Sequence, residues 1–400
     1  MITFLIFLIY VWFLLRFPTK TILLTIIWYP SMTLYKVLNP ALVVSAGLML
    51  LYLKERRKIG KIIDFPFWIP FLVCLSSYVI SFTVWSSSYA SVYSSIFIYL
   101  LPLFFWIYYK GNAQWHKFYM KHLILYLFIL SIVGIIESIC NINIFYDIAK
   151  SLDPEIPDKG FNIRFGLKQA QSITIWCECY GMVCGLAAAV IPFYMDKWKI
   201  NFSIKYYVLL GFLLFSVICS GSRSAIVSCA ICLIGTILHF NLKKLLLFLI
   251  PVILVPVLFP EMFDEIYGSI VHQGTYGGSS SDMRENQWLF CLSYIGKDTL
   301  FGTGLGRTWT IGYESDLLGA ESILFYTIID RGFWGLITIA FLYIYILFYL
   351  FKNKNFALCF VVIGFLVNKV VTLTAGLDET YPLLWLIPLL KEQMLEKNNK

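Results

Sequence analysis

The sequence carries little charge: Asp, Glu, Lys and Arg together make up 14% of its 400 residues. A soluble globular protein has about 25% charged residues, so an ordinary water-soluble fold does not fit. Histidine occurs only four times, at scattered positions, which argues against a metal centre built on imidazole ligands. No basic patch is interleaved with exposed aromatic residues, and we therefore expect no binding to nucleic acid.

Cysteine is present ten times, but mostly inside apolar runs. Cys229 and Cys232 have the spacing of half a zinc or redox motif. No second pair accompanies them, and their neighbours are apolar, so we interpret both as small buried hydrophobic side chains. The sequence thus predicts no metal site and no cofactor.

Hydrophobic residues make up 60% of the chain. Apolar runs of about 17–25 residues, the length that crosses a bilayer as a helix, recur from end to end. They do not alternate apolar and polar residues with a period of two, which disfavours a β-barrel. We predict an all-α integral membrane protein with a single polytopic domain, residues 1–400, of about twelve transmembrane helices.

The positions of Lys and Arg give this bundle an orientation. The densest basic cluster, Lys54–Lys61, and nearly all the others fall on one side, as expected for the cytoplasmic side of a membrane. A long polar loop at 261–320 and a shorter one at 141–168 fall on the other side, together with the turn Ser220–Ser224. The net charge of +8 is then a property of the cytoplasmic loops. We expect Ile2–Leu15 to be a retained helix rather than a signal peptide.

The final apolar run, Tyr381–Leu390, is too short to span as a straight helix at about 1.5 Å per residue, and we expect a bent or partial span there. The other predicted spans are Ile2–Leu15, Thr21–Tyr35, Val37–Leu53, Phe65–Val84, Val92–Tyr109, His122–Cys140, Gln169–Met195, Tyr206–Ser220, Ser224–Phe240, Leu245–Pro260, Ser322–Phe351 and Phe356–Ala375.

Four arginines on the external side are candidate anion ligands. Arg223 lies in the turn Ser220–Ser224, between two apolar runs, where a guanidinium costs several kcal/mol unless a partner or water is present. Arg164, Arg284 and Arg307 lie in the two external loops. Guanidinium groups bind phosphate oxygens in pairs, so a convergence of these residues would suit a diphosphate. The alternative is a set of separate surface arginines, with Arg223 snorkelling from a tight turn.

Carboxylates near the same loop are candidate general bases. Glu321 opens a long apolar segment, where partial desolvation would raise its pKa and let it accept a proton from a sugar hydroxyl. Asp282 and Glu178 are rivals for this role, and Asp330-Arg331 can be read as a local ion pair. Gly302–Gly306 resembles a nucleotide-binding loop only superficially, and we interpret it as a structural loop of closely packed backbone.

The order and spacing of these motifs resemble the O-antigen polymerase and O-antigen ligase superfamily of bacterial membrane glycosyltransferases. The resemblance covers roughly Arg164 to Leu336. It rests on Arg164-Phe-Gly166, Ser220-Gly-Ser-Arg-Ser224, Asp282-Met-Arg284 with Trp288, Thr299-Leu-Phe-Gly302-Thr-Gly-Leu-Gly306, Glu321-Ser322 and Gly332-Phe-Trp-Gly335. In the ligases the position of Glu321 is usually His, and this departure favours a polymerase.

The resemblance implies a GT-C-like bundle in the bacterial inner membrane with its active site facing the periplasm. The donor would be an oligosaccharide on undecaprenyl diphosphate, transferred to a new lipid-linked repeat unit. Arg164, Arg223, Arg284 and Arg307 would hold the diphosphate, and Glu321 or Asp282 would act as the base. Such a reaction requires neither metal nor nucleotide sugar. The resemblance also allows a chain-length regulator protein as a partner.

Two alternatives stay open. A ligase would transfer the finished glycan to lipid A core instead of extending it. A polysaccharide flippase or other transporter, from a different functional class, would also have about twelve spans, but such transporters usually show two related halves. The sequence shows no internal repeat.

Overall fold

The chain is described by a computed structural model. It describes residues 2–32, 64–84, 99–109, 111–152, 162–201, 203–240, 280–294, 300–308, 322–372 and 376–398, with a few positions between 260 and 268. Within these residues the regular structure is helical apart from one short hairpin, which confirms the all-α prediction. The predicted spans Val37–Leu53 and Leu245–Pro260 lie outside the described residues, Pro260 excepted.

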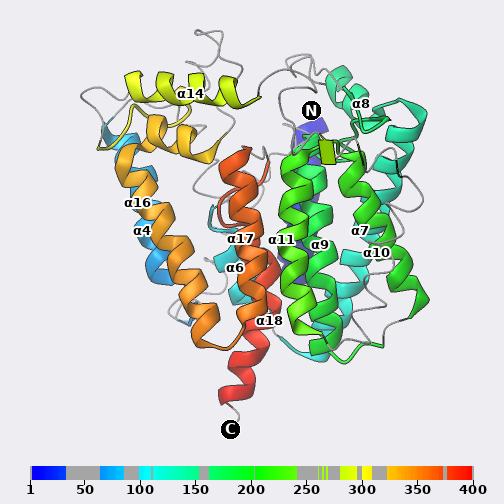
Figure 1. The fold of residues 1–400 in the computed structure, drawn as a ribbon. Coiled ribbons are helices and arrows are strands. Elements are labelled where there is room, and N and C mark those ends of the chain that lie inside the picture. The colour runs from blue at the N-terminus through cyan, green and yellow to red at the C-terminus, as the bar shows by residue number, and fades with distance from the viewer. Residues whose placement is uncertain are drawn as a thin grey trace.

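The long helices stand side by side and form a bundle, and α14 (Ser280–Tyr294) lies across one end of it (Figure 1). In the first half of the chain the helices are α1 (Ile2–Arg16), α2 (Pro18–Met32), α4 (Trp68–Val84), α6 (Leu101–Tyr108), α7 (Ala113–Cys140), α8 (Ile144–Leu152) and α9 (Cys177–Lys197). In the second half they are α10 (Ile204–Cys219), α11 (Arg223–His239), α14 (Ser280–Tyr294), α16 (Ile323–Lys352), α17 (Phe356–Val371) and α18 (Tyr381–Asn398). The strands β1 (Ile163–Arg164) and β2 (Leu167–Lys168) form the hairpin.

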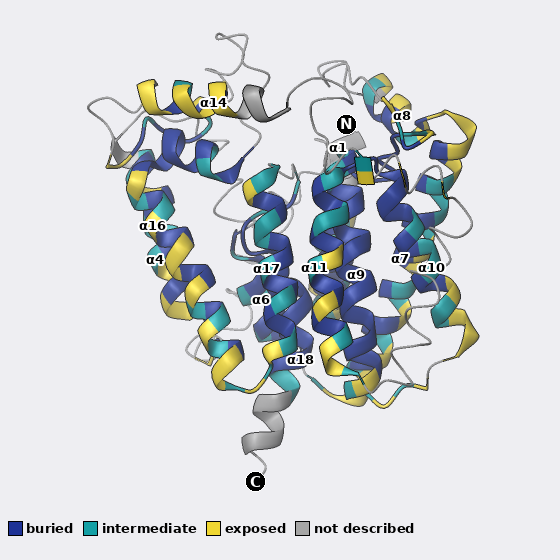
Figure 2. Cartoon of the chain, viewed as in Figure 1, coloured by how far each residue is buried: buried dark blue, intermediate teal, exposed yellow. Residues whose placement is uncertain are grey.

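Three of the described helices, α7, α9 and α16, are long and apolar enough to cross a membrane. Several shorter apolar helices accompany them, among them α10, α11 and α17. Large apolar side chains are exposed on α1, α7 and α16. Figure 2 shows the exposed face of α16. Monomeric soluble proteins rarely expose so many large apolar side chains on contiguous faces, so the described helices support the assignment to the membrane.

Small residues bring the central helices together. α11 packs against α9 and α17 in the middle of the bundle (Figure 1). An added methyl group at Gly235 would lie 2.2 Å from the carbonyl oxygen of Ala357, and one at Gly364 would lie 2.4 Å from Cys232 Sγ. Helices in a lipid environment associate through such small residues, because close backbone approach supplies the packing energy. Cys229 and Cys232 are buried here, as the sequence predicts.

The predicted spans agree with the described helices in most places. One difference is Gln169–Met195, because the helix α9 begins only at Cys177. Residues 169–176 form irregular structure that carries Gln171, Ser172 and Thr174, and polar side chains of this kind compete with the helix for hydrogen bonds. Another difference is His122–Cys140, because α7 already begins at Ala113 and includes Lys117 and Lys121. α18 also continues past Leu390 to Asn398 with Pro388 inside it, so the last helix is longer than its apolar run.

The two ends of the bundle differ in what they carry. At one end lie α8, the β1–β2 hairpin, the start of α11 and the start of α16, with α14 placed across the top of α16 (Figure 1). At the other end lie the last turns of α9 and α11 and the turn between α16 and α17. The segments at this second end carry the lysines Lys197, Lys199, Lys352 and Lys354.

Candidate functional site

The β1–β2 hairpin places Arg164 at the end of the bundle. Arg164 pairs with Leu167 across a two-residue turn, Phe165-Gly166, in which both residues have positive φ angles of 57° and 69°. Two consecutive positive φ angles are the geometry of a tight hairpin turn, and glycine adopts one at no cost. The Arg-x-Gly motif of the sequence is therefore a hairpin whose glycine closes the turn.

Burial of the Phe165 side chain offsets the cost of its positive φ angle. Its side chain is 3% exposed and packs in a small apolar cluster with Ile218, near the end of α10. Partly buried Phe215 and Ile226 complete this cluster from α10 and α11. The hairpin is thus fixed to the α10–α11 junction by the residue next to Arg164.

The turn Ser220–Ser224 lies directly beside this hairpin. Arg164 Nη1 donates a hydrogen bond to the carbonyl oxygen of Gly221 at 3.2 Å. The backbone N–H of Ala170 donates to the carbonyl of Cys219 at 2.9 Å. Gly221 has φ +62°, and an added methyl group would lie 2.7 Å from Gln169 Cγ. Two motifs about 57 residues apart therefore meet, and we call residues 162–170 and 219–224 together the arginine turn.

Ser222 begins α11 as its N-cap. Its hydroxyl accepts a hydrogen bond from the Ala225 backbone N–H at 3.3 Å and lies 3.0 Å from Ser224 Oγ. Arg223 is consequently the first residue of the helix, half-buried. A helix N-terminus carries partial positive charge, so a cation there is unfavourable unless an anion is close. Helix N-terminus and guanidinium together favour a phosphate ligand.

The irregular segment 169–176 is held from below by α7. Glu137 is fully buried and its Oε2 accepts a hydrogen bond from the Ser172 backbone N–H at 2.8 Å. The Ser172 hydroxyl donates to the Leu130 carbonyl at 2.7 Å. Ser138 Oγ donates to the Lys168 carbonyl at 2.7 Å. The bond from Glu137 satisfies a backbone N–H that a helix would otherwise pair internally, and the two serine hydroxyls tie the segment and the hairpin to α7. Irregular backbone within a membrane protein requires partners of this kind.

The glycine-rich segment packs on a kink in α16. Gly332 interrupts the helix with φ 66° and ψ −165°. A methyl group added at Gly302 would lie 2.5 Å from the Gly332 backbone nitrogen. The Trp334 N–H donates to the Leu300 carbonyl at 2.9 Å, and the Thr303 N–H donates to the Ile329 carbonyl at 2.7 Å. The interpretation of Gly302–Gly306 as closely packed backbone is confirmed.

Asp330 organises the end of this segment. Its carboxylate accepts hydrogen bonds from the backbone N–H groups of Gly306 and Thr308, both at 2.8 Å, and from Thr308 Oγ1 at 2.6 Å. Arg307 lies between these two anchored residues and is exposed. The buried carboxylate thus presents the Arg307 side chain outward. We call residues 300–308 with 327–335 the α16 kink.

Arg331 points away from Asp330 toward another set of partners. It is 1% exposed, and its Nη2 lies 2.6 Å from Glu379 Oε1. The guanidinium carbon lies 4.2 Å from the centre of the Tyr78 ring, and the Tyr78 hydroxyl donates to Glu379 Oε2 at 3.0 Å. Asp330 and Arg331 therefore have separate hydrogen-bond partners, so the interpretation of these two residues as a local ion pair does not describe their main contacts.

The loop before α18 completes this buried polar cluster. The Lys369 ammonium donates to the Leu377 carbonyl, and the Tyr343 hydroxyl donates to the Glu379 carbonyl at 2.9 Å. Asp378 accepts hydrogen bonds from the Thr380 N–H and hydroxyl, both at 2.7 Å. Burial, followed by repulsion from Glu379, raises the pKa of the Asp378 carboxyl to about 7. This loop, α4, α16 and α17 are thus joined through charged groups in the interior.

Of the remaining predicted residues, Asp282 and Arg284 lie in the helix α14. This helix packs on α16 near the kink, with the Trp288 and Phe325 ring centroids 5.0 Å apart. The side chains of Asp282 and Arg284 lie outside the described residues, as does Glu321. Glu178 lies in the first turn of α9, within hydrogen-bond reach of Cys177 Sγ at 3.4 Å.

The structure therefore brings the Arg164 side chain to the turn that carries Arg223. Arg307 lies between Gly306 and Thr308, which bond to Asp330 of α16. The start of α16 lies at the same end of the bundle as the hairpin (Figure 1). The meeting of all four arginine side chains over one pocket stays a prediction. Glu137, Lys369 and Glu379 are buried charged residues to which the sequence analysis gave no role. The signal for Glu137 and Lys369 was present, because each is a charged residue within an apolar run.

Residues 208–340 match the model of a protein family described as O-antigen ligase. The matched region runs from α10 through the kink of α16, so it contains Arg223, Arg284 and Arg307, together with Glu321. This match confirms the resemblance to the O-antigen polymerase and ligase superfamily. A search of curated proteins finds no match to the chain.

Proposed function

From the similarity of residues 208–340 to the O-antigen ligase family, we propose that this protein is a surface-polysaccharide polymerase of the bacterial inner membrane. It transfers a glycan from undecaprenyl diphosphate to the non-reducing end of a new lipid-linked repeat unit. The chain forms one polytopic domain, residues 1–400, of about twelve transmembrane helices. The end that carries the arginine turn faces the periplasm, together with the loops 141–168 and 261–320.

The contact between Arg164 and the Gly221 carbonyl, 3.2 Å long, carries this proposal. It places the Arg164 guanidinium beside Gly221, which precedes Arg223 by two residues at the N-terminus of α11. In the proposed mechanism, Arg164 and Arg223 bind the diphosphate of the donor, and Arg284 and Arg307 approach from the side of α16. The guanidinium groups stabilise the charge that develops on the leaving diphosphate.

The acceptor hydroxyl requires a base, and Glu321 is the proposed one, with Asp282 as the alternative. Glu321 directly precedes Ser322, whose hydroxyl caps α16 by accepting from the Leu324 N–H at 3.2 Å. A positioned general base contributes about 10²–10⁴-fold to a rate. We expect Glu321→Gln to lower turnover by that order while donor binding changes little. Unchanged turnover would show that Glu321 is not the base and would leave Asp282 as the candidate.

The direct test uses the purified protein and its lipid-linked repeat unit. A polymerase produces a ladder of products that differ by one repeat. Failure to form ladders with a donor that demonstrably binds would contradict the proposal.

A ligase activity is the second candidate, because the matched family is described as O-antigen ligase. Cells distinguish the two activities. A strain without a polymerase places single repeats on its lipopolysaccharide, whereas a strain without a ligase places none.

A further inference from the structure

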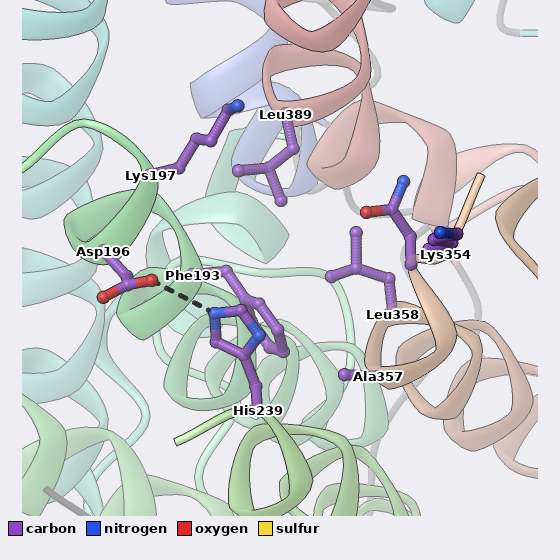
Figure 3. A pocket seen from close by; sticks show the side chains of 9 residues that line it. Phe193, Asp196, Lys197, His239, Lys354, Ala357, Leu358 and Leu389 are labelled. Carbon is purple, nitrogen blue, oxygen red and sulfur yellow. Dashed lines mark hydrogen bonds and ion pairs between the residues drawn. The ribbon is translucent and has the colours of Figure 1, made fainter. Parts of the chain in front are cut away.

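A pocket lies at the end of the bundle opposite the arginine turn. Its volume is about 130 Å³, and its walls come from α9, α11, α17, α18 and the turn between α16 and α17 (Figure 3). α11 begins at Arg223 and ends at His239, which lines this pocket. At 1.5 Å per residue, the helix separates the two sites by about 24 Å. The pocket is therefore distinct from the proposed diphosphate site.

The polar part of the pocket has an excess of positive charge. Lys197, Lys354 and His239 line it, and Asp196 is the acidic residue of the lining. His239 Nε2 lies 3.3 Å from Asp196 Oδ2, so this carboxylate is already engaged by the imidazole (Figure 3). The two lysines consequently determine the electrostatic character of the pocket, which favours an anionic ligand.

The N-terminus of α17 adds to this preference. Asn355 is the residue before the helix, and Ala357 and Leu358 of its first turn line the pocket. The partial positive charge of a helix N-terminus favours a bound anion. Lys197 and His239, by contrast, lie in the last turns of α9 and α11, where a cation also offsets the helix dipole. That role explains their charge but not the cavity beside them.

The floor of the pocket is apolar. Leu358 and Leu389 point into the space, and the Phe193 ring lies with its centroid 4.6 Å from that of His239 (Figure 3). Beside the lining residues, Leu238 and Phe356 expose 58% and 51% of their surface. An anionic group thus finds cations at the mouth and apolar surface on either side. This combination matches a phospholipid headgroup with its acyl chains along the helices, better than it matches a soluble ion.

We propose that this pocket binds the phosphate headgroup of an anionic phospholipid from the leaflet at the lysine-rich end of the bundle. The lysines and the α17 N-terminus contact the phosphate, and the acyl chains lie along α11 and α17. Basic pockets between transmembrane helices bind anionic headgroups in this way. The bound lipid joins α9, α11, α17 and α18 at their ends and so stabilises the folded bundle.

The test compares two pairs of lysines on the purified, delipidated full-length protein. Lys354 and Lys199 both adopt left-handed backbone conformations, with φ 58° and 52°, and both are exposed at this end. Asparagine tolerates that conformation. Lys197→Gln with Lys354→Asn removes the pocket cations, and Lys199→Asn with Lys352→Gln is the matched control outside the lining.

Phosphatidylglycerol, phosphatidylethanolamine and inorganic phosphate are titrated separately, with bound lipid measured by native mass spectrometry and stability by the melting temperature. A lysine near an anionic lipid contributes about 1 kcal/mol, or roughly 5-fold in affinity. We expect phosphatidylglycerol to bind and stabilise the wild type, binding to fall roughly 30-fold in the pocket variant, and the control to retain it.

Equal binding of phosphatidylglycerol by both double variants would overturn the proposal. Stabilisation by inorganic phosphate as large as that by the lipid would show a soluble anion as the ligand and would also overturn it. If the pocket double variant does not fold, Lys354→Asn against Lys199→Asn gives the same comparison, with an expected roughly 5-fold difference from one exposed lysine.

Discussion

The arginine turn and the α16 kink both contain arginines among small residues, yet Arg223 of the turn and Arg331 of the kink differ in their surroundings. Arg331 of the kink is 1% exposed and pairs with Glu379 at 2.6 Å. Arg223 of the turn is half-buried and begins a helix. An arginine in an apolar sequence can thus form an ion pair in the interior of the bundle, as Arg331 does, or remain partly accessible at its end, as Arg223 does.

The largest effect is expected in the kink. Glu379→Ala leaves the Arg331 guanidinium buried without its counter-ion, and loss of one partner of a buried pair costs about 3–5 kcal/mol. We expect a marked fall in the melting temperature of the purified protein and in its level in the membrane. The double variant Arg331→Met with Glu379→Leu removes both charges and should recover most of the loss. A single variant as stable as the wild type would show that the pair does not support the fold.

The arginine turn should respond in activity rather than in stability. Arg223→Ala removes a group proposed to stabilise the leaving diphosphate, and loss of one such donor lowers a rate by about 10²–10³-fold. We expect polymer ladders to disappear while the protein level and melting temperature stay close to those of the wild type. Arg223→Lys keeps the charge without the paired N–H groups, so its activity should be intermediate. Normal ladders in Arg223→Ala would remove the phosphate-site interpretation.

A smaller effect follows from the loop beside the kink. Burial and then the neighbouring Glu379 raise the pKa of Asp378 from its ordinary value near 4 to about 7. The folded protein therefore binds a proton that the unfolded chain has released in this range. The stabilisation is complete below about pH 4 and is lost as the pH rises toward 7. Asp378→Asn should flatten this decline in melting temperature measured across the range. A slope unchanged by the substitution would contradict it.

The smallest effect is expected from metal removal. In the α16 kink, Arg331 and Glu379 balance each other's charge. In the arginine turn, the proposal has the arginines balance the charge of the donor diphosphate. EDTA should thus leave the rate of ladder formation by the purified protein unchanged, whereas strong inhibition that added Mg²⁺ reverses would assign part of the charge compensation to a metal ion.

Sequence periodicity and length predicted most of the helices, because a span needs a continuous apolar run that local composition reveals. The start of α9 was missed for the same reason. Residues 169–176 adjoin a continuous apolar run, but Ser172 in this segment bonds to α7, with its backbone N–H donating to Glu137 and its hydroxyl donating to the Leu130 carbonyl. Those partners lie about 35–42 residues away in the chain, so no local pattern contains them.

The candidate site divides in the same way. The motifs Arg164-Phe-Gly166 and Ser220–Ser224 were identified from the sequence, and the hairpin geometry explains why the first of them needs its glycine. The role of Phe165 could not be predicted, because its anchor is the apolar cluster with Ile218 from a later helix. The partners of Asp330 and Arg331 could not be predicted either. The two residues are adjacent in the chain, which suggested that they pair with each other.

The residue order was sufficient to predict a bundle of apolar helices, the clustering of lysines at one end of it, and the arginines that stand among small residues. These properties follow from transfer energies and helix geometry, which act residue by residue. The folded chain was needed to show that Arg164 contacts Gly221, that Arg331 pairs with Glu379, and that His239, Lys354 and Leu389 surround one pocket. Contacts between distant segments depend on how helices pack, and packing is a property of the whole bundle.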